Sequence, residues 1–175
     1  MVHDRERIDL TTAMARLLTD SELRLAFRDD CEQLANELNL CCDDRAAFLG
    51  LDVDQLDQQA DGLISKRREE VARLIPETWQ RLGPSSDPLF RSFAESFWPA
   101  SHKRHTEDAV AFAKFLQAQS IIVVYQPELN WRQFQLSDRR WRFCWIRDYL
   151  VNEEPHRALQ LLYRWRGRHY QQFIT

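Results

Sequence analysis

The sequence predicts an α+β protein in which a helical N-terminal lobe is followed by a small C-terminal antiparallel β-sheet. Helical spacing of apolar residues dominates the chain up to about residue 119. Beyond that point, β-branched runs and stretches that alternate apolar and polar residues become frequent. Four glycines in 175 residues fit a largely helical chain and argue against glycine-rich nucleotide loops. We therefore expect a helical domain over residues 1–119 and an Arg/Trp-rich antiparallel β domain over residues 120–175.

Capping residues and apolar spacing place the helices of the first domain. Thr19 or Asp20 can cap the second helix, and Asp52 can open the longest one. Pro76 suits a helix start, because the N–H that proline lacks has no partner there. Residues 83–88, rich in Gly, Pro and Ser, form the clearest break. The expected helices cover residues 9–18, 21–38, 45–49, 53–74, 76–82, 89–98 and 106–118.

The strands of the second domain are predicted from shorter patterns. Residues 121–125 are β-branched, although this run could instead extend the preceding helix. Residues 131–136 and 140–147 alternate apolar and polar side chains, and residues 158–167 form a third such segment with a turn at 166–168. In one interpretation the tryptophans of these strands pack on the core and the arginines face solvent.

The charge is unevenly distributed along the chain. Residues 1–119 contain 15 Lys and Arg against 22 Asp and Glu, whereas residues 120–175 contain 9 against 5. All nine cations of the C-terminal segment are arginines, whose planar forks match carboxylates and phosphates. The segment therefore favours an anionic partner, unless it folds back on the acidic N-terminal part of its own chain.

Arginine and tryptophan alternate in this segment, which is its most distinctive feature. An arginine-lined strand surface or edge can take an extended acidic peptide by β-augmentation. Nucleic acid is an alternative but unlikely partner, because the chain as a whole is acidic, with a net charge of −3. The candidate peptide-binding residues are Arg132, Arg139, Arg140, Arg142, Arg164, Arg166 and Trp141.

No pattern of catalytic residues is present in the sequence. It lacks G-x-S-x-G, H-E-x-x-H and Walker motifs, and its carboxylate pairs are adjacent in sequence and so point apart on a helix. His102 and His105 could hold a metal together with a cysteine, but a loop before a helix explains them more simply. We expect no catalytic residue and no metal site in this chain. The absence of a long apolar segment predicts no membrane partner and a cytoplasmic protein.

Several segments resemble one bacterial protein family in order and spacing. These segments are residues 18–27, 45–52, 55–60, 66–71, 76–79 and 102–115. They are similar to small proteins encoded beside genes for peptide natural products. Within that group, the chain looks like the small accessory subunit of the multinuclear non-haem iron oxidase of 3-thiaglutamate (pearlin-type ribosomal peptide) biosynthesis. The resemblance covers about residues 18–118 and does not extend to the arginine-rich segment.

The resemblance implies a division of labour between two subunits. A larger TIM-barrel oxidase subunit would hold the iron ions, and this chain would hold no cofactor. With O₂, the oxidase would excise the β-carbon of a cysteine at the C-terminus of a ribosomally made carrier peptide. The small subunit would bind the leader part of that peptide and present its end to the iron.

Overall fold

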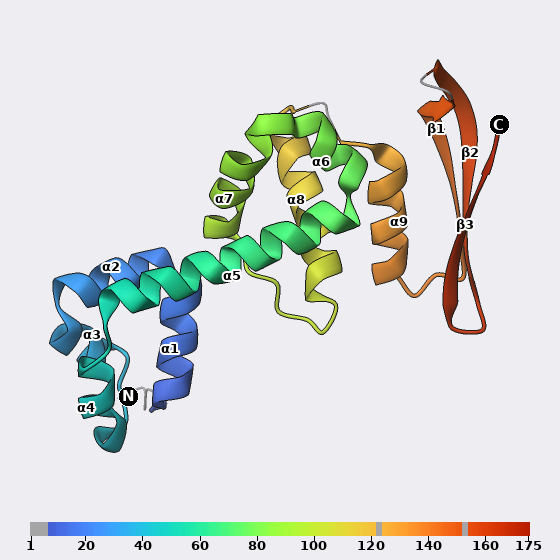
Figure 1. The fold of residues 1–175 in the computed structure, drawn as a ribbon. Coiled ribbons are helices and arrows are strands. Elements are labelled where there is room, and N and C mark those ends of the chain that lie inside the picture. The colour runs from blue at the N-terminus through green and yellow to red at the C-terminus, as the bar shows by residue number, and fades with distance from the viewer. Residues whose placement is uncertain (1–6, 122–123, 152–153) are drawn as a thin grey trace. The chain divides into compact units, whose positions relative to one another are not determined.

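Helices precede a three-stranded antiparallel sheet in the computed structural model, which describes residues 7–121, 124–151 and 154–175. The α+β class predicted from the sequence is therefore confirmed (Figure 1). The chain divides into two compact units, Met1–Lys66 and Arg67–Thr175, and this division falls within α5 (Val53–Leu74). The predicted domains meet elsewhere, at residue 119, and the division into a helical domain over 1–119 and a β domain over 120–175 stays a prediction.

Unit 1 contains short helices, and aspartates cap the first three of them. They are α1 (Leu10–Thr19), α2 (Ser21–Asp29), α3 (Cys31–Glu37) and α4 (Cys42–Leu49), followed by the first part of α5. The Asp9, Asp20 and Asp30 side chains each accept a hydrogen bond from a backbone N–H of the helix that follows. The single helix predicted over 21–38 is wrong, because Asp30 adopts an extended conformation and caps α3 there. Apolar side chains of these helices form one buried cluster that includes Leu17, Phe27, Leu34, Phe48 and Leu56.

Unit 2 begins with helices around an aromatic core. They are α6 (Pro76–Leu82), the 3₁₀ turn η1 (Gly83–Ser85), α7 (Ser86–Ser96) and α8 (Arg104–Ala118). Phe90 and Phe112 are fully buried, and their ring centroids lie 5.2 Å apart in an edge-to-face arrangement. Trp79 of α6 packs against both rings. These contacts fix three helices around one cluster.

One further helix, α9 (Gln126–Leu136), corrects the sequence prediction. Residues 131–136 form its second half, so the strand predicted there is wrong. Pro127 lies in its first turn, where its missing N–H leaves no hydrogen bond unmade. Residue 121 lies outside any strand, and residues 122–123, the centre of the other predicted strand, lie outside the described residues.

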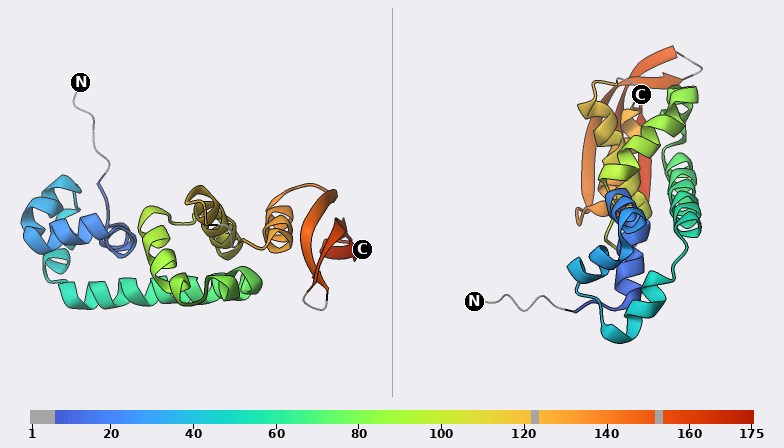
Figure 2. Two further views of the ribbon diagram at one scale, coloured as in Figure 1. Left: turned by 90° about the horizontal axis from the view of Figure 1, so that it is seen from above. Right: turned by 90° about the vertical axis from the view of Figure 1, so that its left-hand side faces the viewer.

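The sheet consists of β1 (Trp141–Val151), β2 (Glu154–Trp165) and β3 (Arg168–Ile174), in that order across the sheet. The strands predicted over 140–147 and 158–167 are therefore confirmed, and the chain turns at Arg166 and Gly167 as expected. The register of β1 shifts by one residue between Ile146 and Tyr149. Helix α9 lies against one face of the sheet, which Figure 2 shows from above and from the side.

Candidate functional site

The C-terminal sheet contains most of the candidate binding residues, and its two faces differ in what covers them. The pairing of Phe143 with Leu161 and of Leu161 with Gln172 places these side chains on one face, because alternate residues of a strand share a face. Their neighbours Cys144, Gln160 and Phe173 share the opposite face, which α9 contacts. The face turned away from α9 is called the outward face below. It comprises Trp141, Phe143, Trp145, Leu159, Leu161, Tyr163, Trp165, Arg168, Tyr170, Gln172 and Ile174.

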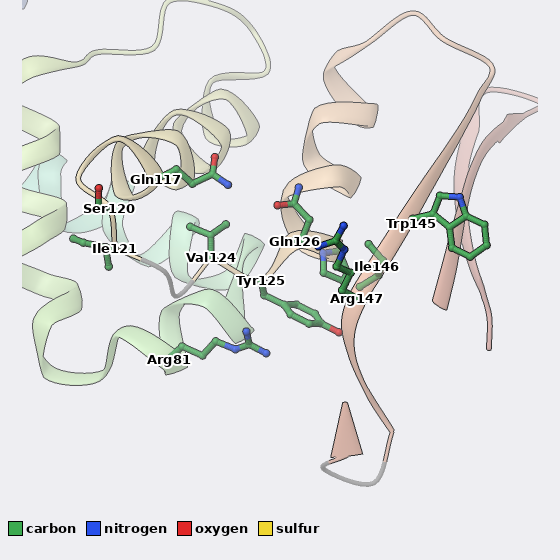
Figure 3. Close-up of a pocket in the computed structure, with 11 residues that line it drawn as sticks. Arg81, Gln117, Ser120, Ile121, Val124, Tyr125, Gln126, Trp145, Ile146 and Arg147 are labelled. Atoms are coloured by element: carbon green, nitrogen blue, oxygen red, sulfur yellow. The ribbon is translucent and has the colours of Figure 1, made fainter. Parts of the chain in front are cut away.

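Aromatic side chains are exposed on the outward face. Trp145 is 79% exposed, Phe143 63%, Trp165 61% and Trp141 54%. Figure 3 shows the Trp145 ring on the far side of β1 from α9. The interpretation in which the tryptophans pack on the core is therefore wrong for this sheet. The helix-facing side instead buries Ile146, Ala158, Gln160 and Leu162.

A row of stacked rings crosses the outward face near the start of β1. The Trp141 and Tyr163 centroids lie 5.3 Å apart, and those of Tyr163 and Tyr170 lie 5.2 Å apart, with nearly parallel planes in both pairs. These contacts connect all three strands through cross-strand neighbours. The end of the sheet that holds Trp141 is therefore a rigid aromatic platform.

A buried amide network attaches the sheet to α9. The Asn130 amide nitrogen donates to Gln160 Oε1 at 3.1 Å, and Gln160 Nε2 donates to the Pro127 carbonyl at 3.0 Å. Gln126 in turn donates to Asn130 Oδ1 at 2.9 Å. Because the Gln160 side chain is fully buried, these bonds satisfy groups that would be costly to leave unpaired. The network fixes which face of the sheet is covered.

Three of the predicted peptide-binding arginines are held by the chain itself. Arg132 Nε donates to the Leu74 carbonyl at 2.8 Å, and burial lowers the pKa of its guanidinium from the ordinary value. Arg142 donates to Gln133 Oε1 at 3.0 Å. Arg164 donates to the Ser137 carbonyl and to His169. Arg142 and Arg164 attach the sheet to α9 and to the residue after it, whereas Arg132 attaches α9 to α5. The structure leaves all three less available to a ligand.

The other three predicted arginines and Trp141 come together at one end of the sheet. Arg139 and Arg140 precede β1, and Arg166 lies in the turn between β2 and β3. Since Trp141 pairs with Tyr163 and Trp165 pairs with Arg168, the start of β1 and this turn lie at the same end. All three arginines are exposed and form no side-chain hydrogen bond or ion pair with the described residues. We call Arg139, Arg140, Arg166 and Trp141 the arginine end.

The sequence prediction missed the remaining exposed residues of this surface, notably Phe143, Trp145 and Arg168. The alternating pattern of β1 was recognised, but the pattern does not say which face is covered. The missing information was the position of α9, whose second half was interpreted as another strand. The high density of aromatic residues in 141–145 was the available signal.

A cleft of about 420 Å³ lies between the helices of unit 2 and β1. Arg81 of α6 stacks on the Tyr125 ring, with its guanidinium carbon 4.7 Å from the ring centroid. Burial raises the pKa of the Tyr125 phenol, so it remains a neutral hydrogen-bonding group near neutral pH. Ile146 and Arg147 line the opposite wall (Figure 3). The cleft combines cations with amides and apolar walls, which suits binding of a polar group better than proton transfer.

No set of ligands for a metal stands out in the described part of the chain. Groups of three or more His, Cys, Asp or Glu side chains placed to hold an ion are absent among those residues. His102 and His105 therefore gain no third ligand of these types there. The four cysteines are free thiols. Among the described helices, none combines the length and the apolar character that a bilayer crossing requires.

Residues 43–118 match a protein family described as SCO6045-like, C-terminal domain. The match begins in α4 and ends at the last residue of α8, so it stops before α9 and the sheet. Comparison with curated proteins and comparison with solved structures gave no significant match. The helical middle of the chain is thus similar to the SCO6045-like C-terminal domain.

Proposed function

We propose that this chain is a non-catalytic subunit that binds a carrier peptide by its leader part. It would present the C-terminal cysteine of that peptide to a multinuclear iron oxidase, which excises the cysteine β-carbon in 3-thiaglutamate biosynthesis. The observation that carries the proposal is the arginine end, where three guanidinium groups without a partner among the described residues lie at the same end of the sheet as an exposed tryptophan of an edge strand. The family resemblance of residues 18–118 supplies the reaction and the partner.

The edge of β1 suits an extended peptide. β1 pairs with β2 on one side, and no further strand of the described residues pairs with its other side. A peptide that adds there can pair its backbone with the free N–H and C=O groups of β1. Acidic side chains of such a peptide would meet Arg139 and Arg140 next to the same strand. The edge would provide affinity, and the arginines would provide charge selectivity.

In this proposal the iron chemistry belongs to the partner subunit. The chain contributes by holding the end of the peptide in one position, which converts an encounter of free molecules into a reaction within a complex. Positioning of this kind accounts for up to roughly 7–11 kcal/mol of a reaction barrier in favourable cases. A subunit without catalytic groups can therefore be essential for turnover.

The first test measures binding of a fluorescently labelled carrier peptide by anisotropy. Replacing three arginines at the arginine end (Arg139→Gln, Arg140→Gln and Arg166→Gln) should weaken binding and flatten its dependence on salt, because charged contacts are lost. The control removes the same amount of charge from exposed helix positions (Arg16→Gln, Arg104→Gln and Lys114→Gln) and should bind as the unmodified chain does. Equal affinity of both variants would show that the peptide binds elsewhere.

A second candidate function, nucleic-acid binding by a regulatory protein, is favoured by one observation. Exposed aromatic rings beside arginines form the kind of platform on which single-stranded bases stack. A labelled single-stranded oligonucleotide in place of the peptide tests this alternative. Tight binding with a steep salt dependence would favour it, and binding of the peptide alone would exclude it.

A further inference from the structure

We infer that the outward face of the sheet, centred on Phe143 and Trp145, is the docking surface for the oxidase subunit. It adjoins the peptide-binding edge of β1 at Trp141 and is otherwise distinct from it. This inference rests on the proposed function, which supplies the oxidase. Its structural basis is the group of exposed apolar side chains on this face, with Phe143 and Trp145 at its centre. Exposed aromatic residues gathered on one face of a protein mark a surface that another molecule covers.

The backbone geometry of a sheet indicates what kind of molecule covers this face. Within the sheet the strands use their backbone N–H and C=O groups to pair with one another, so a face offers side chains only. An extended peptide lying on the face would leave its own backbone groups without partners. A helix or sheet of a folded protein satisfies those groups internally and can cover the face. The face therefore fits a folded partner, and the edge fits the peptide.

The charges around the face indicate the chemistry of that partner. Among its described residues the outward face contains no carboxylate, and exposed arginines stand at both of its ends: Arg166 and Arg168 at one, Arg157 at the other. Two exposed carboxylates lie near these ends, Asp138 beside Arg139 and Glu154 at the start of β2, and the arginines outnumber them. Two copies stacked face to face with like ends together would oppose Arg166 and Arg168 of one copy to those of the other. The complementary surface is thus an apolar patch bordered by Asp and Glu on a different protein.

The test uses the full chain co-expressed with the iron oxidase subunit of the same genome and purified by size-exclusion chromatography. The variant Phe143→Glu with Trp145→Glu places two charges at the centre of the face. Both side chains are largely exposed, so the fold should be retained, as circular dichroism can verify. We expect its affinity for the oxidase to fall by at least about 30-fold, because central aromatic residues dominate such interfaces. Its affinity for the labelled carrier peptide should stay within about two-fold of the unmodified chain.

The matched control is Leu25→Glu, which changes an apolar side chain of similar exposure, 56%, on a helix of unit 1. This variant should bind both oxidase and peptide normally. If the unmodified chain forms no complex with the oxidase, the proposed function itself fails and the inference fails with it. If that complex forms and the face variant retains it, the inference alone is overturned.

Three further outcomes would also overturn the inference. If the face variant lost peptide binding but still formed the oxidase complex, the face would be the binding site of the peptide. Sedimentation of the unmodified chain as a dimer, and of the face variant as a monomer, would make a second copy the occupant. Loss of oligonucleotide binding in the face variant, without loss of the oxidase, would assign the face to nucleic acid.

Discussion

The Arg67 side chain is a buried cation held by several groups of unit 2. Its Nε and Nη2 atoms donate to the two carboxylate oxygens of Asp108 at 2.9 and 2.8 Å, and Nη2 also donates to the Phe97 carbonyl. The guanidinium carbon lies 4.4 Å from the centroid of the Trp98 ring. Both side chains of the pair are almost fully buried, so the two charges compensate each other where little water reaches them. The ion pair connects α5, α8 and the segment after α7.

Replacing Asp108 with asparagine should therefore destabilise the protein strongly. The change keeps the shape of the side chain but leaves the buried Arg67 charge without a counterion. Breaking a buried pair in this way costs about 3–5 kcal/mol in free energy of unfolding. Urea unfolding followed by circular dichroism measures the loss. The exposed pair of Arg68 with Asp87 provides the control, since Asp87→Asn should change the midpoint far less. Similar losses for the two variants would contradict the assigned role of burial.

At the scale of elements, α5 contains a glycine that the helix does not require. A Cβ atom added at Gly62 would meet nothing within 4 Å, and the residue lies in the exposed middle of the helix. Gly62→Ala should raise the free energy of unfolding by about 0.5–1 kcal/mol, because glycine loses more backbone entropy on folding. Chemical denaturation measures this gain.

Gly83 gives the opposite expectation and serves as the control. A Cβ would also find open space there, but the backbone has φ +54° and ψ −133°, a conformation that residues with side chains rarely adopt. Gly83→Ala should cost about 1–3 kcal/mol. If both substitutions stabilised the protein, backbone conformation would not decide whether an added Cβ raises or lowers the free energy of unfolding.

The elements show where sequence patterns suffice and where they fail. The range of α5 was predicted correctly, because a long helix repeats its apolar spacing many times. Helix α9 was missed because one of its buried positions is Asn130, a polar residue that does not contribute to an apolar period. Asn130 can be buried because Gln160, which lies on a strand far away in the sequence but close in space, accepts its hydrogen bond. Long-range pairing of this kind leaves no local signal.

At the scale of the whole molecule, the candidate site was predicted only in part for the same reason. The arginines and Trp141 were identified from composition, since nine arginines stand within the last 56 residues. Which arginines are available to a ligand depends on α9. Arg132 belongs to α9 and bonds to α5, and Arg142 of β1 bonds to α9. A strand with arginines on one face and tryptophans on the other fits either orientation by sequence alone. The covered face was decided by the amide network.

The division into units also separates the charges. Met1–Lys66 contains 7 Lys and Arg against 15 Asp and Glu, a net charge of −8, and Arg67–Thr175 contains 17 against 12, a net charge of +5. An anionic partner is thus attracted to the second unit and repelled by the first. Long-range attraction of this kind acts on the encounter of two proteins before their surfaces touch. The charge of the second unit should therefore set association rates more than dissociation rates.

Stopped-flow mixing of the chain with the oxidase subunit tests this expectation. The association rate constant should fall steeply between about 0.01 M and about 1 M salt, as the Debye length shortens from about 30 Å to about 3 Å. In the proposed complex the dissociation rate constant should change little, because the aromatic contacts of the outward face would determine it. Trp145→Ala should accelerate dissociation and keep the salt slope of association. Arg166→Gln with Arg168→Gln should flatten that slope and leave dissociation nearly unchanged. If instead the aromatic variant altered the salt slope and the arginine variant altered only dissociation, the exposed cations would not be steering the encounter.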